Sequence, residues 1–247
     1  MQFRGYQMDN GNEIKPTEAF DVVNQYLGWG EAVGGLWFVG LEEAADWGEP
    51  TEKQIAEWKK DIPISPCVEP TDGSNYPGER ILTGKQIRAY TCKIAQPLSK
   101  DFADSDWQTY RARRFWRPGC GLLQINLFPL GKPHRSDWPE HFKRTYGFGN
   151  GDQEEYRSCV ERTRFRQIAD FWETSGKPPV VTFGMEGWAS CKTIFGLDGG
   201  EILDGGKVVA CRKRRVILAP FFSYWHMSNS RAKLISDTLK EWGVTLP

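Results

Sequence analysis

The sequence has no close pair of cysteines, no long apolar run and no leading signal pattern. Its six cysteines are scattered along 247 residues and no two form a CxxC pair, although most zinc and iron–sulfur sites need such a pair. A disulfide framework is not expected in a chain of this size. We therefore expect reduced thiols, no metal and no cofactor, in a cytoplasmic protein that does not contact a membrane.

Motifs that bind nucleotides or metals are also missing. The chain has no GxxxxGK[ST] phosphate loop, no GxGxxG fingerprint and no HExxH metal motif, which disfavours an unrelated nucleotide-processing α/β enzyme. No repeat, low-complexity tract or linker divides the sequence. We therefore expect residues 1–247 to form a single domain, because this length suits one medium α/β domain, and we expect a monomer.

Charge is balanced in total but not along the chain. The formal net charge is zero, yet residues 1–75 hold 5 Lys/Arg against 14 Asp/Glu, and the remainder carries the opposite excess. Basic residues cluster at 111–117, 132–135 and 212–215. Such clusters can neutralise phosphates, although a single run of this kind is more often a solvated surface.

Compact apolar segments alternate with amphipathic ones. Residues 35–40, 121–128, 178–184 and 216–220 have the composition of buried strands, and residues 208–211 of an edge or hairpin strand. Helices are expected at 16–26, 51–60, 83–95, 153–174 and 230–242. The pattern predicts an α/β fold with three αβα layers around a central, mostly parallel, four-stranded sheet. Ligands bind beyond the carboxyl ends of such strands.

The polar residues at those ends are the candidates for chemistry. Glu42 and Glu43 follow the first strand, where a carboxylate can hold water or stabilise a developing cation, or simply cap a helix. Asn126 ends the second strand, and its amide can read a pyrimidine edge or form a turn. His226 and the Ser228–Ser230 segment follow the fourth strand, where backbone amides at a helix start suit a phosphate, or the serines only cap that helix.

Taken together, these segments resemble motifs of the uracil-DNA glycosylase superfamily. Gly40-Leu41-Glu42 is similar to that family's Gly-x-Asp-Pro-Tyr-His motif, with Glu in place of Asp. Residues 122–126 resemble its Leu-Leu-x-Asn segment, and residues 226–230 its His-Pro-Ser-Pro-Leu-Ser loop without either proline. Together with the apolar strand at 179–184, the resemblance covers roughly residues 35–242.

The resemblance implies a role for each matched residue. Glu42 would activate water and stabilise the sugar cation, with Glu43 or Asp46 as alternatives, and His226 would stabilise the leaving base. Asn126 would bind the extruded base and Trp47 would stack on it. Contacts with the DNA backbone would come from a further set of side chains, which comprises Ser228, Asn229, Arg231, Arg113 and Arg114.

One departure from the family bears on the choice of base. In uracil-specific members a tyrosine of the first motif excludes substituents at C5 of the base, and Ala44 stands at that position here. Because rejecting a methyl group requires bulk, we expect a pocket that accepts a C5-substituted pyrimidine, such as thymine in a mismatch or a modified cytosine of phage DNA. Genome repair and defence against phage are both compatible with this activity. A DNA-binding relative without catalysis remains the alternative.

Overall fold

The computed structural model describes residues 16–33, 35–42, 49, 51–58, 64–65, 82–132 and 137–247, with residues 57–58, 64–65 and 82–85 described by their backbone alone. The α-helices in these ranges are α1 (Glu18–Gln25), α2 (Glu52–Trp58), α3 (Leu82–Ala95), α4 (Trp107–Arg113), α5 (His141–Tyr146), α6 (Gln153–Thr174), α7 (Trp188–Ile194) and α8 (Asn229–Glu241). The strands are β1 (Gly28–Gly30), β2 (Leu36–Gly40), β3 (Ile64–Ser65), β4 (Leu122–Asn126), β5 (Val180–Phe183), β6 (Glu201–Leu203), β7 (Val208–Cys211) and β8 (Val216–Ala219).

The strands form one mixed sheet whose centre is parallel. Within the described residues the sheet has eight strands in the order β3-β1-β4-β2-β5-β8-β7-β6. The four expected strands are the parallel centre, β4-β2-β5-β8. The sheet is wider than the expected four central strands, because β1 pairs antiparallel with β4. The edge or hairpin strand expected at 208–211 is confirmed as β7, which pairs antiparallel with β8. The outermost strands, β3 and β6, are only two and three residues long, too short to show a hydrophobic pattern.

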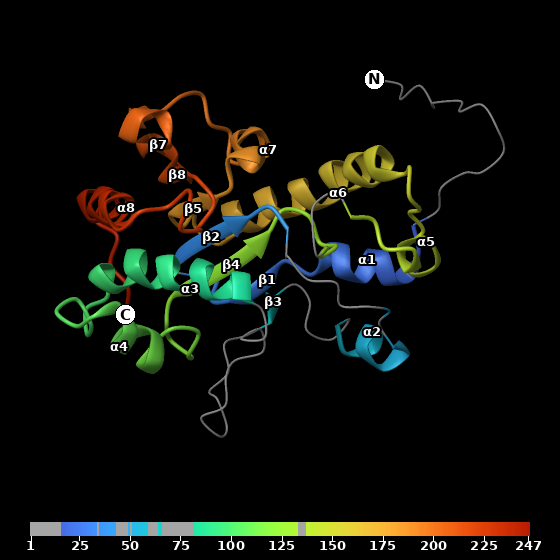
Figure 1. The fold of residues 1–247 in the computed structure, drawn as a ribbon, viewed down its shortest axis with the longest axis horizontal. Helices are drawn as coiled ribbons and strands as arrows, with labels where there is room; N and C mark the ends of the chain where they lie inside the picture. Colours follow the sequence, from blue (N-terminus) through green and yellow to red (C-terminus); the bar gives the residue numbers. More distant parts are fainter. Residues whose placement is uncertain are drawn as a thin grey trace.

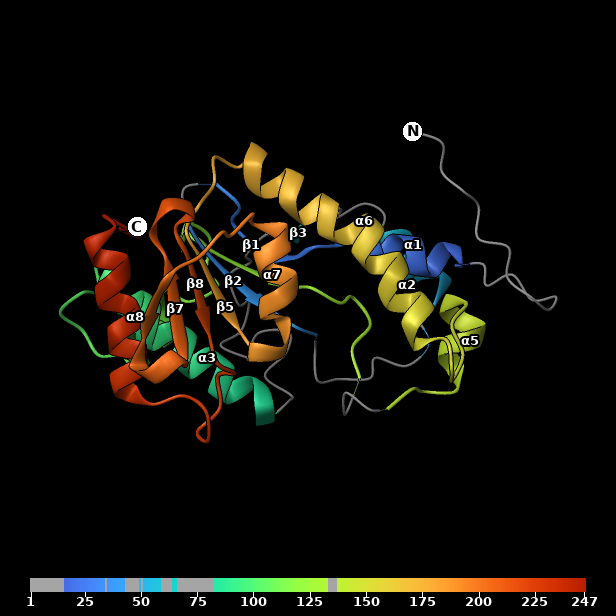
Figure 2. The same ribbon diagram turned by 90° about the horizontal axis from the view of Figure 1, so that it is seen from above.

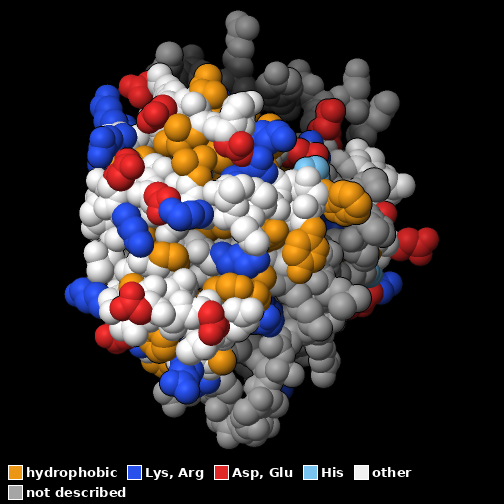
Figure 3. All heavy atoms as spheres, turned by 60° about the vertical axis from the view of Figure 1, so that its left-hand side comes forward, with side chains coloured by type: hydrophobic (Ala, Val, Ile, Leu, Met, Phe, Trp, Pro, Cys, Tyr) orange, Lys and Arg blue, Asp and Glu red, His pale blue; other side chains and the backbone are white. Residues whose placement is uncertain are grey.

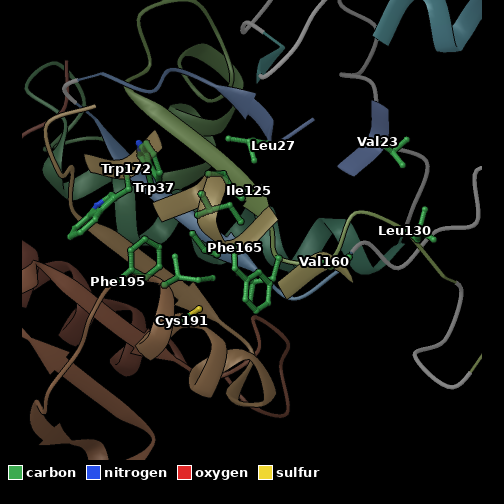
Figure 4. Close-up of a cluster of buried hydrophobic side chains, with 14 of the residues drawn as sticks. Val23, Leu27, Trp37, Ile125, Leu130, Val160, Phe165, Trp172, Cys191 and Phe195 are labelled. Carbon is green, nitrogen blue, oxygen red and sulfur yellow. The ribbon is translucent and has the colours of Figure 1, made fainter. Parts of the chain in front are cut away.

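Helices cover both faces of this sheet, as Figures 1 and 2 show. Successive residues of a strand point to opposite faces. Trp37 and Val39 therefore pack with α1, α5, α6 and α7, in the cluster drawn in Figure 4. Leu36 and Phe38 pack with α3, α4 and α8 on the other face. The expected three-layer αβα arrangement is confirmed.

The long helix α6 shows why sequence pattern and structure agree here. Residues 153–174 were expected to form an amphipathic helix, and α6 has these bounds. Its buried residues include a series at four-residue steps, which forms one face of a helix. That series is Tyr156, Val160, Arg164, Ile168 and Trp172. In the described part of the chain no helix is both long enough and apolar enough to cross a membrane.

The four central strands end at the same level. Gly40 of β2 is in register with Asn126 of β4 and with Phe183 of β5, and Phe183 is in register with Ala219 of β8. The chain passes from β2 to β4 on one side and from β5 to β8 on the other, so the strand order reverses between β2 and β5. In open α/β sheets ligands bind beyond the carboxyl ends at such a reversal. We refer to this end of the sheet as the carboxyl edge.

Candidate active site

Glu42 lies immediately beyond the carboxyl edge. Pairing between β2 and β4 continues past the strands, because the backbone N–H groups of Leu127 and Phe128 donate to the carbonyl oxygens of Gly40 and Leu41 at 2.9 and 2.8 Å. These bonds fix the backbone that leads into Glu42. The position of this carboxylate is therefore set by the sheet itself.

Glu42 is largely buried and paired with a lysine. Its Oε2 lies 3.2 Å from Nζ of Lys132, and the two side chains are 13% and 6% exposed. The lysine ammonium also lies 5.4 Å from the centre of the Trp138 ring, close enough for a cation–π contact. From the sequence, Lys132 belongs to a basic cluster that could bind phosphates. In the structure its ammonium group is buried beside Glu42.

A small cavity adjoins this ion pair. It measures about 40 Å³, which is enough for a water molecule. Its wall consists of Leu41, Glu42, Phe128, Lys132, Trp138, Gln153, Tyr156 and Arg157. A cavity that joins a carboxylate, an ammonium group and space for water has the components needed to orient a nucleophilic water.

Tyr156 of α6 forms the polar back of this cavity. Its hydroxyl accepts a hydrogen bond from the backbone N–H of Leu130 at 3.2 Å. Burial, and then the negative charge of nearby Glu42, raise the pKa of Tyr156 above its usual range. The phenol therefore stays neutral across the physiological range.

Asn126 occupies the end of β4 beside Gly40. A Cβ on Gly40 would lie 3.1 Å from Oδ1 of Asn126 and 2.5 Å from Cζ of Phe183, so the glycine permits both side chains to lie over the end of β2. In the part of the chain that the structure describes, the half-buried carboxamide makes no hydrogen bond to another residue. The amide is thus available to a ligand at the carboxyl edge.

The main chain of Asn126 is held from behind by a buried arginine. Nε and Nη2 of Arg164 donate to its carbonyl oxygen at 3.0 and 2.8 Å. The same guanidinium donates to the carbonyl oxygens of Asn24 and Tyr26, each at 2.6 Å. Burial lowers the pKa of Arg164 to about 10, so it remains a cation at neutral pH. Arg164 therefore fixes the end of β4 to the turn between α1 and β1.

Phe183 is an aromatic residue of the site that sequence reasoning missed. Its ring lies next to the Gly40 Cα and is stacked on Phe222 with the ring centres 5.0 Å apart. It was assigned only to an apolar strand, because nothing in the sequence shows which strand residue ends at the level of Asn126. The expected stacking residue Trp47, together with Glu43, Ala44 and Asp46, lies outside the described residues.

The His226 segment follows β8 and enters α8. The side chain of Ser228 caps α8 by accepting a hydrogen bond from the N–H of Arg231 at 3.1 Å. His226 is exposed, and its carbonyl oxygen accepts from the Arg231 guanidinium, which is also paired with Asp204. Arg231 thus holds the loop in place, and its expected contact with DNA stays a prediction.

The remaining predicted DNA contacts divide between the two ends of the sheet. Asn229 is near the His226 loop, and its Oδ1 accepts a hydrogen bond from Lys93 Nζ at 2.8 Å. Arg113 ends α4 and Arg114 donates to the carbonyl of Gly119, just before β4 begins. The structure therefore does not bring Arg113 and Arg114 to the carboxyl edge, and the basic run at 212–215, which precedes β8, lies at the same opposite end.

Comparisons of the chain with protein-family models, with curated proteins and with solved structures give no match. Among the described residues, no three side chains from His, Cys, Asp and Glu come together as possible ligands of a metal ion.

Proposed function

We propose that this protein is a DNA glycosylase that hydrolyses the N-glycosidic bond of an extruded pyrimidine nucleotide and leaves an abasic site. The observation that carries the proposal is the position of two groups at the level ends of adjacent strands. The buried Glu42 carboxylate follows β2, and the available Asn126 carboxamide ends β4. Glu42 follows β2, which borders the point where the strand order reverses, and Asn126 ends the next strand; that point is the usual ligand position of such a sheet.

The proposed reaction needs a side chain that binds the base, a water molecule that attacks the sugar, and groups that stabilise the developing charges. Asn126 would bind the polar edge of the base with its donor and acceptor groups, after the nucleotide has left the duplex stack at a cost of about a few kcal/mol. The bond between C1′ and the base nitrogen breaks, and the base leaves with the electron pair. Water then adds its oxygen to C1′, and the proton that it loses passes to the departed base anion, which leaves as the neutral base.

Glu42 and His226 would stabilise the two charges that develop. The sugar becomes cation-like, and a carboxylate nearby stabilises it. His226 would donate a hydrogen bond to an oxygen of the departing base. Lys132 would keep Glu42 ionised, since an opposite charge 3.2 Å away favours the charged form.

The proposed substrate is a pyrimidine with a substituent at C5. Its support is the sequence, where Ala44 stands in place of the bulk that would exclude such a group. Uracil is the simpler alternative substrate, and an assay with both kinds of base separates them.

The test is an abasic-site assay. Oligonucleotides that contain uracil, mismatched thymine, hydroxymethylcytosine or its glucosylated form are incubated with the protein and then cleaved by alkali. We expect product from at least one C5-substituted base, and a rate at least about 100-fold lower for Glu42→Gln, because preorganised charge contributes on this scale. Glu173→Gln, an exposed change on α6, is the matched control and should retain full activity.

One observation favours a second function, that of a DNA-binding protein without catalysis. The ion pair with Lys132 already engages the Glu42 carboxylate, and such pairing reduces the charge available to a sugar cation. DNA binding without product on any of the four bases would support this alternative and overturn the glycosylase proposal.

A further inference from the structure

The loop between β8 and α8 exposes large aromatic side chains. Trp225 is 93% exposed, Tyr224 is 69% exposed and Phe221 is 37% exposed. Exposed aromatic residues are enriched at binding surfaces because the rings offer large contact area at little conformational cost. The exposure of two adjacent large rings therefore indicates a binding surface.

Hydrogen bonds anchor the loop that carries these rings. The N–H of Tyr224 donates to Oε1 of Gln86 on α3 at 3.1 Å, and the Tyr90 hydroxyl donates to the carbonyl oxygen of Met227 at 2.8 Å. Met227 itself is buried. Figure 2 shows this loop beside the beginning of α3. The backbone that carries the rings is thus fixed to α3, and binding would need little further ordering of that backbone.

A cation contacts the ring that lies against Tyr224. The Tyr224 ring contacts the Tyr90 ring edge-on, with centres 6.2 Å apart, and Lys93 Nζ lies 4.8 Å from the centre of the Tyr90 ring. Lys93 also donates to Asn229 at the start of α8. An aromatic face for a base and an ammonium group for a phosphate are therefore offered within a few side chains of His226.

The charge of the surrounding surface separates the possible partners. Figure 3 shows Lys and Arg side chains interspersed with Asp and Glu on the side of the molecule that carries α8, and the described residues of that side form no broad basic field. Proteins bind duplex DNA mainly through its phosphates. A surface of mixed charge is therefore expected to bind duplex DNA only weakly. Unpaired bases expose their faces, and aromatic rings can stack on them whatever the base sequence, while a nearby cation such as Lys93 contacts the backbone.

We propose that Trp225 and Tyr224 form a stacking surface for the bases of unpaired DNA, so that the protein acts on single-stranded or locally opened DNA. The choice of DNA as the ligand rests on the proposed function. The test measures binding alone, and its outcome is therefore distinguishable from a failure to excise bases.

The experiment is fluorescence anisotropy with the full chain and a labelled oligonucleotide, which is tested as a single strand and as a duplex. The oligonucleotide is about 15 nucleotides long, because the known binding sites of single-strand-binding domains extend up to about this length. We expect the single strand to bind more tightly than the duplex. Trp225→Ala should weaken single-strand binding by about 5- to 150-fold, the range for losing one stacked base, while Trp225→Tyr, which keeps a ring, should retain most of it.

Two controls separate stacking from other effects. Ile202→Ala removes a side chain that is 72% exposed on β6 and should leave single-strand binding unchanged. The melting temperature of Trp225→Ala should equal that of the parent, since the ring is almost wholly exposed. Equal single-strand binding by parent and Trp225→Ala, or tighter binding of the duplex, would overturn the proposal. So would self-association of the parent that Trp225→Ala abolishes, because the rings would then bind a second copy of the chain.

Discussion

Glu42 and Lys132 form a largely buried ion pair at the candidate site. The net contribution of such a pair to the free energy of unfolding is small, because desolvation offsets the attraction, but removing one of the two charges is strongly destabilising. Removing one partner leaves an uncompensated charge, at about 3–5 kcal/mol. We expect Lys132→Met to lower the free energy of unfolding by this amount. Urea denaturation followed by circular dichroism provides the measurement.

The double variant Lys132→Met with Glu42→Gln tests the cause of that loss. Because no charge is left unpaired, it should be markedly more stable than Lys132→Met alone. If the two single effects simply added, the stability of this region would not depend on the ion pair.

Gly40 tests how closely the groups of the site approach one another. A Cβ there would lie 2.5 Å from the ring of Phe183 and 3.1 Å from Asn126 Oδ1, so Gly40→Ala must displace one or both. We expect a loss of about 1–3 kcal/mol in stability, as for other overpacked positions, and a larger loss of base excision than this change in stability explains.

Gly187→Ala is the matched control for Gly40→Ala. Its added Cβ would meet only side-chain methyl groups of Leu127 and Leu41, at 3.2 and 3.4 Å. Thermal unfolding and the abasic-site assay should both show a smaller effect. Equal activity losses for the two variants would indicate that the end of β2 plays no special part in the reaction.

At the scale of elements, Arg164 joins three segments. Its guanidinium donates to carbonyl oxygens of the α1–β1 turn and of β4, and the side chain is 1% exposed. Each buried carbonyl left without a donor costs about 1–3 kcal/mol. We therefore expect Arg164→Met to lower the unfolding free energy by more than about 4 kcal/mol, which is exceptional for one substitution.

Arg166→Met on the same helix provides the comparison for Arg164→Met. Arg166 is exposed, and its replacement should change stability by less than about 0.5 kcal/mol. Guanidinium chloride titrations of both variants measure the difference. Similar values for the two would contradict the assigned structural role of Arg164.

Elements that bury many apolar residues were predictable, and short or polar ones were not. The four central strands are mostly apolar, and α6 repeats its buried residues every four positions, so local sequence determines both. β1 is Gly-Trp-Gly and β6 is mostly exposed, and they become strands only because β4 and β7 offer them partners. α4 was not predicted as a helix, because its sequence was interpreted as a basic cluster and Tyr110 is its one buried residue.

The site was predictable to a similar extent. The positions of Glu42 and Asn126 followed from strand ends, because parallel strands end at a common edge. Lys132, Phe183 and Arg164 could not be assigned, since their partners are set by how distant segments pack. Lys132 meets Glu42 only after β4 has been placed beside β2, and no local pattern encodes that contact.

For the whole molecule, buried thiols and phenols lower the free energy of unfolding as the pH becomes alkaline. Burial raises the pKa of Cys191 from 9.0 to about 12, and it also raises the pKa of Tyr110 and of Tyr156. Above pH 9 the unfolded chain loses protons that the folded protein keeps. The stabilisation is therefore complete below pH 9 and is lost as pH rises toward 12.

We accordingly expect the free energy of unfolding to fall above pH 9. The Cys191 thiol alone contributes about 1.4 kcal/mol per pH unit in this window. Chemical denaturation at pH 8 to 11 measures the slope, and Cys191→Ala should make it shallower. An unchanged slope in this variant would show that the thiol of Cys191 is not shielded from water.

The contacts of Arg164 also set an order of events during synthesis. The carbonyl of Asn126 waits for a donor that lies 38 residues later in the chain. At ribosomal rates of about 5–20 residues per second, that is a delay of about 2–8 s. The N-terminal part of the sheet can thus collapse on the ribosome, but the carbonyl oxygen of Asn126, at the end of β4, lacks its arginine donors until α6 has been made.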